Sequence, residues 1–324
     1  MKAVVYTEYG SPDVLHLQEI EKPVPRDNEV LIKVHATSIN SWDWDMLRGK
    51  PYLFRLLSGI FKPKYKILGA DVAGRIETVG ANVSNFKPGD DVFGDLCENG
   101  WGGFAEYVCA GEESLALKPD WMPFEHAAAI PQAAVMALLS VLDKGQVRQG
   151  QKVLINGAGG GVGTFAIQMA KSYGAEVTGV DRAHKFDLMR SIGSDHVIDY
   201  TKEDYTRTGQ RYDLIVDVVA NRPVFDYRRA LNPGGKFIMV GGTVAAILQA
   251  AFLGALISMY GKKKIGMLAH KPNKDLQDIS ELIRNGKVTP VIDRQFPLEE
   301  TPDAFRYFGK GNFGGKIIIT VAEN

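Results

Sequence analysis

A glycine-rich turn in the middle of the sequence has the residue types and spacing needed to bind phosphate. It follows an apolar run at 153–155 that predicts a buried strand, and it precedes an amphipathic stretch at 164–173 that predicts a helix. In this order, the backbone N–H groups at the helix N-terminus are available to a pyrophosphate. The turn therefore predicts a dinucleotide-binding site built from Gly157, Gly160, Gly161, Val162 and Gly163.

Charged residues at the end of the next predicted strand, 176–180, bear on which dinucleotide binds. Asp181 lies about 20 residues beyond the glycines, where a carboxylate accepts hydrogen bonds from the adenosine ribose of NAD. Arg182, His184 and Lys185 follow, and they are able to pair with the 2′-phosphate of NADP if Asp181 turns aside. A third interpretation is a solvated helix start, because charges are common at such turns. Both NAD(H) and NADP(H) therefore remain candidates.

The elements that position this turn are strands that alternate with helix-length segments from about residue 123 onward. Alternation of this kind predicts a parallel sheet covered by helices. The predicted strands are 153–155, 176–180, 196–198, 214–216 and 236–240. The sequence thus predicts an α/β dinucleotide-binding domain over residues 123–270.

The regions on either side of this domain have a different pattern. Residues 1–122 contain short alternating apolar strands broken by Pro, Gly and Asn, which predicts a β-rich domain. Residues 271–324 begin with a predicted helix that ends near residue 284, and they finish in the apolar strand 316–320. We expect this last segment to rejoin the first domain.

Composition excludes several classes of protein. The 324 residues exceed the size at which a single core usually stops growing, about 250 residues, so two domains are expected. The 38 basic and 38 acidic residues balance, which argues against an electrostatic hold on nucleic acid. Cys97 and Cys109 are too few for a disulfide framework, and the first residues read directly into a strand rather than a signal peptide. We expect a cytoplasmic protein.

One uncharged apolar stretch, 244–260, precedes three consecutive lysines and resembles a membrane segment with a basic flank. It is shorter than the roughly 20 apolar residues needed to span a bilayer, and it contains Gln249 and Gly254. We therefore expect no membrane span. The apolar surface predicts instead a helix that is buried as a lid or against a partner subunit.

Several motifs, taken with the glycine turn, resemble the zinc-free quinone oxidoreductase branch of the medium-chain dehydrogenase/reductase superfamily. They run along the whole chain, at 2–6, 69–74, 88–90, 101–107 and 131–134. The resemblance implies a Rossmann parallel-sheet cofactor domain inserted into a β-rich GroES-like catalytic domain. It also implies a homodimer.

Zinc-containing members of the superfamily have a Cys at the position of Asn40 and a His-Glu pair at the positions of Ala70 and Asp71. The cysteine-rich lobe that holds a structural zinc is also missing, because two cysteines cannot supply four thiolates. The resemblance therefore implies a protein without zinc.

The same resemblance implies further cofactor contacts. Tyr200 is expected near the adenosine end, and Lys316 is expected to close over the cofactor from the C-terminal segment. Met136 replaces a Thr that is usual near the nicotinamide, and Met fills that space without the hydrogen bond. The residues expected beside the nicotinamide are Val240, Gly241 and Gly242, although a tight turn would need the two glycines equally.

A missing metal restricts the chemistry. Hydride transfer to a plain ketone builds charge on one oxygen, which zinc stabilises as a Lewis acid. A quinone or an α,β-unsaturated carbonyl spreads that charge, so hydrogen bonding and orientation suffice. We therefore expect an NAD(P)H-dependent quinone or enone oxidoreductase. Its catalytic candidates are Asn40, an amide donor, and Tyr52, a proton donor. Alternatively, Asn40 caps a turn, and Tyr52 packs in the core or at the surface.

Two other functions compete with this one. The first is an alcohol dehydrogenase that works without zinc. The second is a dinucleotide-binding protein without turnover, acting as a redox sensor or structural partner. Fold alone does not separate them from the reductase.

Overall fold

The computed structural model describes residues 1–52 and 55–322, and the chain divides into two units. Unit 1 contains Met1–Gln132, Pro272–Ser280 and the chain from Ile292 onward, whereas unit 2 contains Ala133–Lys271 and Glu281–Val291. The first predicted boundary lies at residue 122, whereas unit 1 continues to Gln132. The predicted C-terminal segment is itself divided, because residues 281–291 associate with unit 2.

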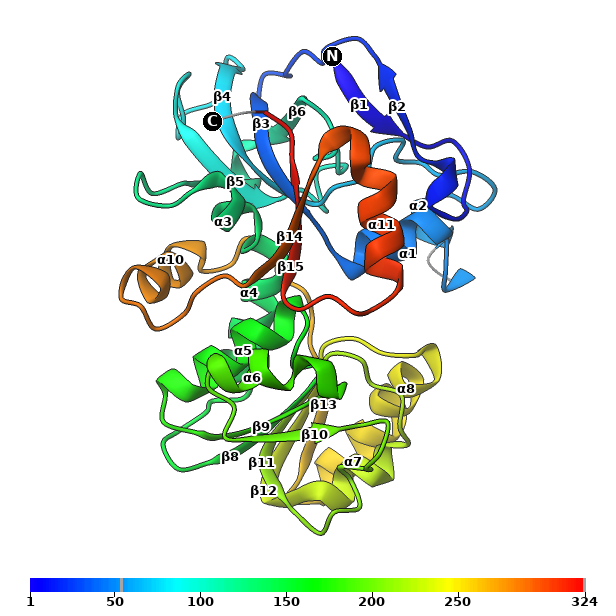
Figure 1. Ribbon diagram of the computed structural model, residues 1–324, viewed down its shortest axis with the longest axis vertical. Coiled ribbons are helices and arrows are strands. Elements are labelled where there is room, and N and C mark those ends of the chain that lie inside the picture. The colour runs from blue at the N-terminus through cyan, green and yellow to red at the C-terminus, as the bar shows by residue number, and fades with distance from the viewer. Residues whose placement is uncertain (53–54, 323–324) are drawn as a thin grey trace. The chain divides into compact units, whose positions relative to one another are not determined.

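Unit 1 is built mostly on antiparallel strands, and the pair β14 and β15 is parallel. A two-stranded sheet pairs β1 (Lys2–Val5) with β2 (His16–Glu19). A seven-stranded sheet runs in the order β14 (Ile292–Pro297), β15 (Lys316–Thr320), β3 (Glu29–Ile39), β4 (Asp71–Val79), β5 (Asp91–Asp95) and β7 (Ala116–Leu117), with β6 (Tyr107–Gly111) paired to β3. The last strand, β15, lies antiparallel to β3, so the C-terminal segment completes the sheet begun near the N-terminus (Figure 1).

Short helices connect these strands. They are η1 (Pro12–Val14), α1 (Ser41–Arg48), α2 (Arg55–Ser58), η3 (Glu112–Ser114), α3 (Phe124–Ala128), η7 (Leu298–Glu300) and α11 (Thr301–Gly309), with α10 (Leu276–Arg284) crossing from unit 1 to unit 2 in sequence. Helix α1 starts directly after β3, where the Asn40 N–H donates to the Asp43 carboxylate at 2.8 Å. It ends at Gly49, whose φ of 56° is the left-handed conformation that suits glycine at a helix end.

Unit 2 contains a six-stranded sheet in which every pair is parallel. Its order is β10 (His196–Asp199), β9 (Glu176–Asp181), β8 (Lys152–Asn156), β11 (Tyr212–Asp217), β12 (Leu231–Met239) and β13 (Lys264–Met267). The five predicted strands are confirmed. The sixth, β13, was not predicted, because its four residues show neither alternation nor a sustained apolar run.

The helices of unit 2 follow the strands in the expected alternation. They are α4 (Pro131–Leu138) and η4 (Leu139–Lys144) before the sheet, then α5 (Gly161–Ser172), η5 (Ala183–Lys185), α6 (Phe186–Ser191), α7 (Val224–Ala230), α8 (Val244–Gln249), η6 (Ala250–Gly254) and α9 (Ala255–Tyr260). From β8 the chain first adds β9 and β10 on one side, and then β11 to β13 on the other. A reversal of this kind marks the place where open α/β sheets bind ligands at the carboxyl ends of their strands.

The apolar stretch 244–260 forms the helical run α8, η6 and α9, as predicted. Within this chain only one side of the run is buried, and burial of the other side as a lid or against a partner subunit stays a prediction. Small residues on the inner side, such as Ala246 and Ala250, are buried, whereas Leu248, Phe252 and Leu256 are exposed. The reason is that the helix is apolar all round, but the sheet covers only one side of it. None of the described helices is long and apolar enough to cross a membrane.

Candidate active site

The glycine turn lies between β8 and α5 and is tied to the neighbouring strand. The N–H groups of Gly157 and Ala158 both donate to the Val180 carbonyl, at 3.0 and 3.1 Å. Gly157 has a φ of 79°, and a Cβ on Gly163 would lie 2.2 Å from the Gly157 carbonyl oxygen. Both positions therefore require glycine. Helix α5 begins at Gly161, so its first N–H groups lack intrahelical acceptors and suit an anion.

Asp181, at the end of β9, is turned toward this glycine turn. Its Oδ2 accepts the Gly159 N–H at 3.0 Å, and its Oδ1 accepts the Arg182 N–H at 2.8 Å. The Lys185 ammonium lies 3.5 Å from Oδ1, and both side chains are buried. The carboxylate is therefore hydrogen-bonded and charge-balanced within unit 2, and the choice between NAD(H) and NADP(H) stays a prediction.

Two further residues meet at the carboxyl ends of β9 and β10. The Arg182 Nε donates to the Tyr200 hydroxyl at 3.0 Å, and both side chains are exposed. The pairing of Asp199 with Asp181 in these parallel strands places the two residues that follow them side by side. Arg182, Tyr200 and Lys185 thus supply donors around one strand end, as a phosphate on the adenosine ribose would need.

The turn after β12 is held against the backbone of residues 218–220. A Cβ on Gly241 would lie 2.7 Å from the Val218 oxygen, and one on Gly242 would lie 2.4 Å from the Ala220 oxygen. The Ala220 N–H also donates to Gly241 at 2.9 Å. The close packing alone requires both glycines, so contact between Val240, Gly241, Gly242 and a nicotinamide stays a prediction.

In unit 1, three polar side chains form a buried cluster where the ends of β3, β4 and β15 meet (Figure 1). The Lys316 ammonium lies 2.5 Å from the Asn40 Oδ1 and 3.2 Å from the Asp71 Oδ2. The Asn40 Nδ2 donates to the same carboxylate oxygen at 2.9 Å. All three are at most 5% exposed. The register brings them together, because Ser38 lies opposite Asp71 and Ile39 lies opposite Ile317.

Two more donors complete the hydrogen bonding of the Asp71 carboxylate. The Ser38 hydroxyl donates to Oδ2 at 2.7 Å, and the Gln132 N–H donates to Oδ1 at 3.0 Å. Burial raises the pKa of Asp71, and the Lys316 ammonium opposes that rise. Burial also raises the pKa of Asp43, to about 7, against the N–H groups of Asn40 and Gly69. We call Asn40, Asp71 and Lys316 the buried triad.

Comparison with known proteins places this geometry in a family. Residues 26–120 match the alcohol dehydrogenase GroES-like domain, and residues 192–319 match the zinc-binding dehydrogenase family. The chain is 32% identical to a chloroplast envelope quinone oxidoreductase homolog of Arabidopsis thaliana, covering 98% of each sequence. It is 33% identical to an NADPH-dependent alkenal/one oxidoreductase of the same plant, covering 98% of this chain and 79% of that one. The solved quinone oxidoreductase from Coxiella burnetii superposes with a TM-score of 0.88 at 29% identity, covering 99% of each chain.

This chain belongs to the quinone oxidoreductase branch of the medium-chain dehydrogenase/reductase superfamily. As a member of that branch it is an oxidoreductase with a nicotinamide cofactor, and its two units are the GroES-like and Rossmann-like domains of the superfamily. The fold predicted from the sequence is confirmed.

The predicted catalytic residues of this oxidoreductase have different surroundings. The Asn40 amide nitrogen donates to Asp71 and its amide oxygen accepts from Lys316, so both polar atoms of the side chain are used within the buried triad. Asn40 directly precedes α1. Tyr52 is 67% exposed, with the Arg55 guanidinium 5.0 Å from its ring centroid, so the alternative in which it packs in the core is wrong. The Lys316 ammonium is buried against Asn40 and Asp71. A contact of Lys316 with the cofactor stays a prediction.

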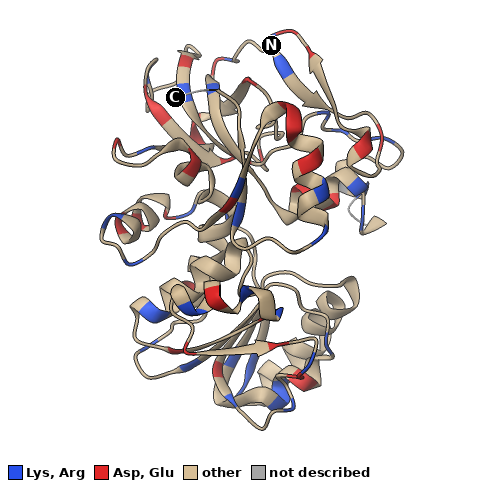
Figure 2. Cartoon of the chain, in the orientation of Figure 1, with Lys and Arg blue, Asp and Glu red and all other residues tan. Residues whose placement is uncertain are grey.

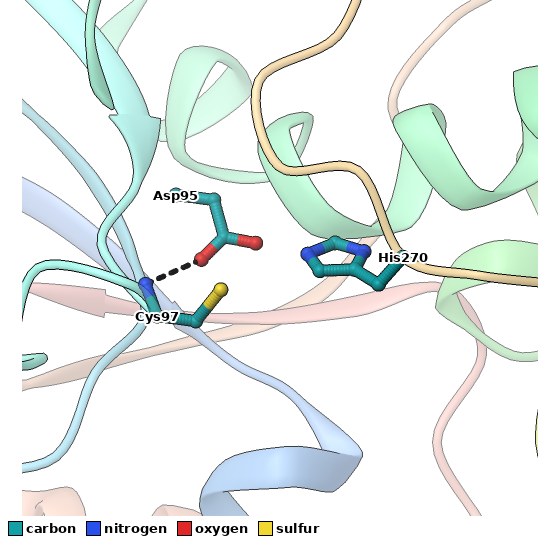
Figure 3. A group of neighbouring side chains, drawn as sticks. All are labelled: Asp95, Cys97 and His270. Atoms are coloured by element: carbon teal, nitrogen blue, oxygen red, sulfur yellow. Dashed lines mark hydrogen bonds between the residues drawn. The ribbon is translucent and has the colours of Figure 1, made fainter. Parts of the chain in front are cut away.

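The superfamily positions that hold zinc ligands do not fit a zinc ion in this chain. Asn40 and Asp71 supply one amide and one carboxylate, both already bound to an ammonium, and Ala70 supplies no donor. Protein zinc sites are built from thiolates, imidazoles and carboxylates that are free to coordinate. Figure 3 shows the nearby Cys97, whose N–H donates to Asp95 at 2.9 Å. Burial and Asp95 raise the pKa of its thiol, which disfavours the thiolate.

Sequence reasoning missed Asp217, which ends β11 beside the glycine turn. Its buried carboxylate accepts hydrogen bonds from the Asn156 amide at 2.8 Å, from the Val219 N–H at 3.0 Å and from the Tyr205 hydroxyl at 3.0 Å. It therefore ties together the carboxyl ends of β8 and β11, where the strand order reverses. The sequence did contain a signal for this residue, because Asp217 is an acidic residue that directly follows the predicted apolar strand 214–216.

Proposed function

We propose that this protein uses NADPH or NADH to reduce quinones or the double bond of α,β-unsaturated carbonyls, without zinc. The observation that carries the proposal is the buried triad, in which the Lys316 ammonium lies between Asn40 and Asp71, two of the superfamily's ligand positions. Such acceptors spread the charge that hydride transfer creates, so they need no Lewis acid. Relatives named as quinone and alkenal/one oxidoreductases support the same substrate class.

The chain's own residues hold the cofactor, whose reduced nicotinamide supplies the hydride. The N–H groups at the start of α5 bind the pyrophosphate, and Arg182, Lys185 and Tyr200 bind the adenosine ribose and its phosphate. Gly163 keeps α5 close enough to β8 to aim those N–H groups. The buried triad fixes the ends of three strands in unit 1, so it acts by positioning.

A panel of acceptors tests the proposal, with the near-ultraviolet absorbance of the reduced cofactor as the readout. We expect the cofactor to be oxidised with quinones and enones and to stay unchanged with simple ketones. Oxidation of simple secondary alcohols in the reverse direction would indicate an alcohol dehydrogenase. Tight cofactor binding without turnover on any acceptor would indicate a binding protein.

Tyr52 is the proposed proton donor, because its exposed hydroxyl is able to reach a substrate. Tyr52→Phe should lower kcat for an enone by about 10-fold or more while leaving cofactor affinity unchanged. The matched control is Tyr173→Phe, an exposed tyrosine beside the C-terminal end of α5 in the other unit. Equal kcat values for the two variants would remove Tyr52 from the mechanism.

The metal-free mechanism is tested by elemental analysis after dialysis against a chelator. We expect less than about 0.1 zinc ion per chain and unchanged turnover, because the ligand positions hold an amide, a methyl group and a paired carboxylate. Cys97→Ser serves as the comparison. The mechanism would be overturned if the wild type kept one zinc ion per chain and Cys97→Ser lost both the zinc and the activity.

We also propose that the protein is a cytoplasmic homodimer, as the family resemblance implies. Within the described residues, β13 forms an edge of the unit 2 sheet, and a second copy pairing there would cover its free N–H and C=O groups. Light scattering during size-exclusion chromatography should give twice the 35.5 kDa chain mass.

A further inference from the structure

The helical run from Val244 to Tyr260 exposes a continuous apolar surface. We define the exposed stripe as Leu248, Phe252, Leu256, Met259 and Tyr260, which recur at helical spacing on one side; Phe252 is 70% and Tyr260 is 85% exposed. The remaining exposed residues of the run are alanines at 245, 251 and 255. Figure 2 shows α8 without a charged residue. Single exposed apolar residues are ordinary, but a whole helix side is not.

The other side of the run is fixed to unit 2. Ala246, Ala250 and Gly254 are buried, and a Cβ on Gly254 would lie 2.7 Å from the Ile265 Cγ2 of β13. Leu253 packs against the hydrophobic core cluster that contains Ala246, Ala250 and Ile265. The helix begins with a side-chain cap, in which the Thr243 hydroxyl accepts the Ala246 N–H at 3.2 Å. The stripe is thus presented on a helix whose inner side is held by the fold.

Positive charge gathers at the C-terminal end of the stripe. Lys262, Lys263 and Lys264 follow Tyr260 and Gly261 directly, and residues 243–274 contain no Asp or Glu. The Lys263 ammonium donates to the Arg228 carbonyl at 2.7 Å. Burial and the guanidiniums of Arg211 and Arg228 lower the pKa of Lys263, so like charges are close together here. We call these five residues the basic cluster.

We propose that the exposed stripe and the basic cluster form a docking surface for a membrane that contains anionic lipid. An apolar helix side with aromatic residues beside lysines is the arrangement by which a helix lies in the headgroup region without spanning the bilayer. Anionic headgroups complement the cluster, and each basic residue close to such a surface favours binding. A second copy seated on the stripe would bring no carboxylate from 243–274 to face the lysines.

Flotation with vesicles tests the docking surface. The probes are vesicles of phosphatidylcholine alone and of phosphatidylcholine mixed with phosphatidylglycerol. The wild-type protein should float with the anionic vesicles only, and high salt should release it. The double variant Phe252→Gln/Leu256→Gln should bind about 10-fold more weakly. Its control is Phe61→Gln, which removes an exposed apolar side chain from unit 1 and should bind like the wild type.

The charge component is tested by Lys262→Gln/Lys264→Gln, for which we expect binding to fall by about 10-fold or more. The matched control, Lys87→Gln/Lys310→Gln, changes two exposed lysines of unit 1 and should bind normally. Unchanged turnover with a soluble quinone shows that each variant is folded. The proposal is overturned if the wild type ignores anionic vesicles, or if stripe and control variants bind alike. A different result would assign the stripe to a second copy of the chain. In that case the wild type would not bind vesicles, and light scattering would show that Phe252→Gln/Leu256→Gln dissociates an oligomer.

Discussion

Replacing Lys316 with methionine is expected to destabilise the protein by about 3–5 kcal/mol, measured by urea unfolding at neutral pH. The ammonium is the only cation that contacts the Asp71 carboxylate among the described residues, and both side chains are buried. Methionine has a similar length and fills the space, so the loss reflects an uncompensated buried charge rather than a cavity.

The pH dependence of this variant identifies the cause. Burial already raises the pKa of Asp71, and losing the ammonium raises it further. A carboxyl whose pKa is higher in the native state favours folding below its unfolded pKa, and that contribution is lost as the pH rises through the native value. The difference between wild type and Lys316→Met should therefore shrink as the pH falls from about 8 to about 5.

The double variant Lys316→Met/Asp71→Asn is the control for this prediction. Removing both charges should restore about 2 kcal/mol relative to Lys316→Met alone, since no buried ion is left without a partner. A loss below about 1 kcal/mol in the single variant, with no pH dependence, would contradict the buried ion pair.

Arg182→Ala should lower kcat/KM for NADPH by about 100-fold and change kcat/KM for NADH less than about 3-fold. The reason is that Arg182 and Tyr200 lie together at the ends of β9 and β10, where the 2′-phosphate of the adenosine ribose would accept their hydrogen bonds. Steady-state kinetics with both cofactors and one quinone measure the ratio.

Asp181→Ser should move the preference in the opposite direction, toward NADPH, by about 5-fold. The change removes a negative charge near the phosphate, and it releases the Lys185 ammonium that now lies 3.5 Å from the carboxylate. The Gly159 N–H loses its acceptor, so both cofactors should bind somewhat less well. If both variants changed the preference between NADPH and NADH in the same direction, this strand end would not contact the ribose.

The sequence was most informative where local pattern determines structure. Five strands of unit 2 were predictable because each is a short apolar run bounded by turn residues, and the glycine turn could be placed between one of them and a helix. The residues at the end of β9 were found for the same reason. The direction of the Asp181 side chain was not predictable, because it depends on the Gly159 N–H across the turn.

The buried triad escaped prediction because it depends on a contact between distant parts of the sequence. Lys316 and Asn40 are 276 residues apart, and only the pairing of β15 with β3 brings them together. The side of 244–260 that packs on the sheet was not predictable, because total hydrophobicity does not say which side of a helix the sheet covers. β13, which packs against that helix, has too short a run to be recognised.

The late arrival of β15 in the chain affects how the protein is made. As the ribosome releases the N-terminal strands, β3 gains β4 on one side and β6 along Glu29–Lys33 on the other. The rest of that second edge, Ala36–Ile39, lacks its partner β15 until residue 320 has emerged. Most of unit 2 is complete earlier, by Lys271, so it is expected to fold first during synthesis. A nascent or truncated chain that ends before Lys316 carries an open edge of β3 together with an unpaired Asp71. Such chains should be the ones that aggregate and that chaperones bind.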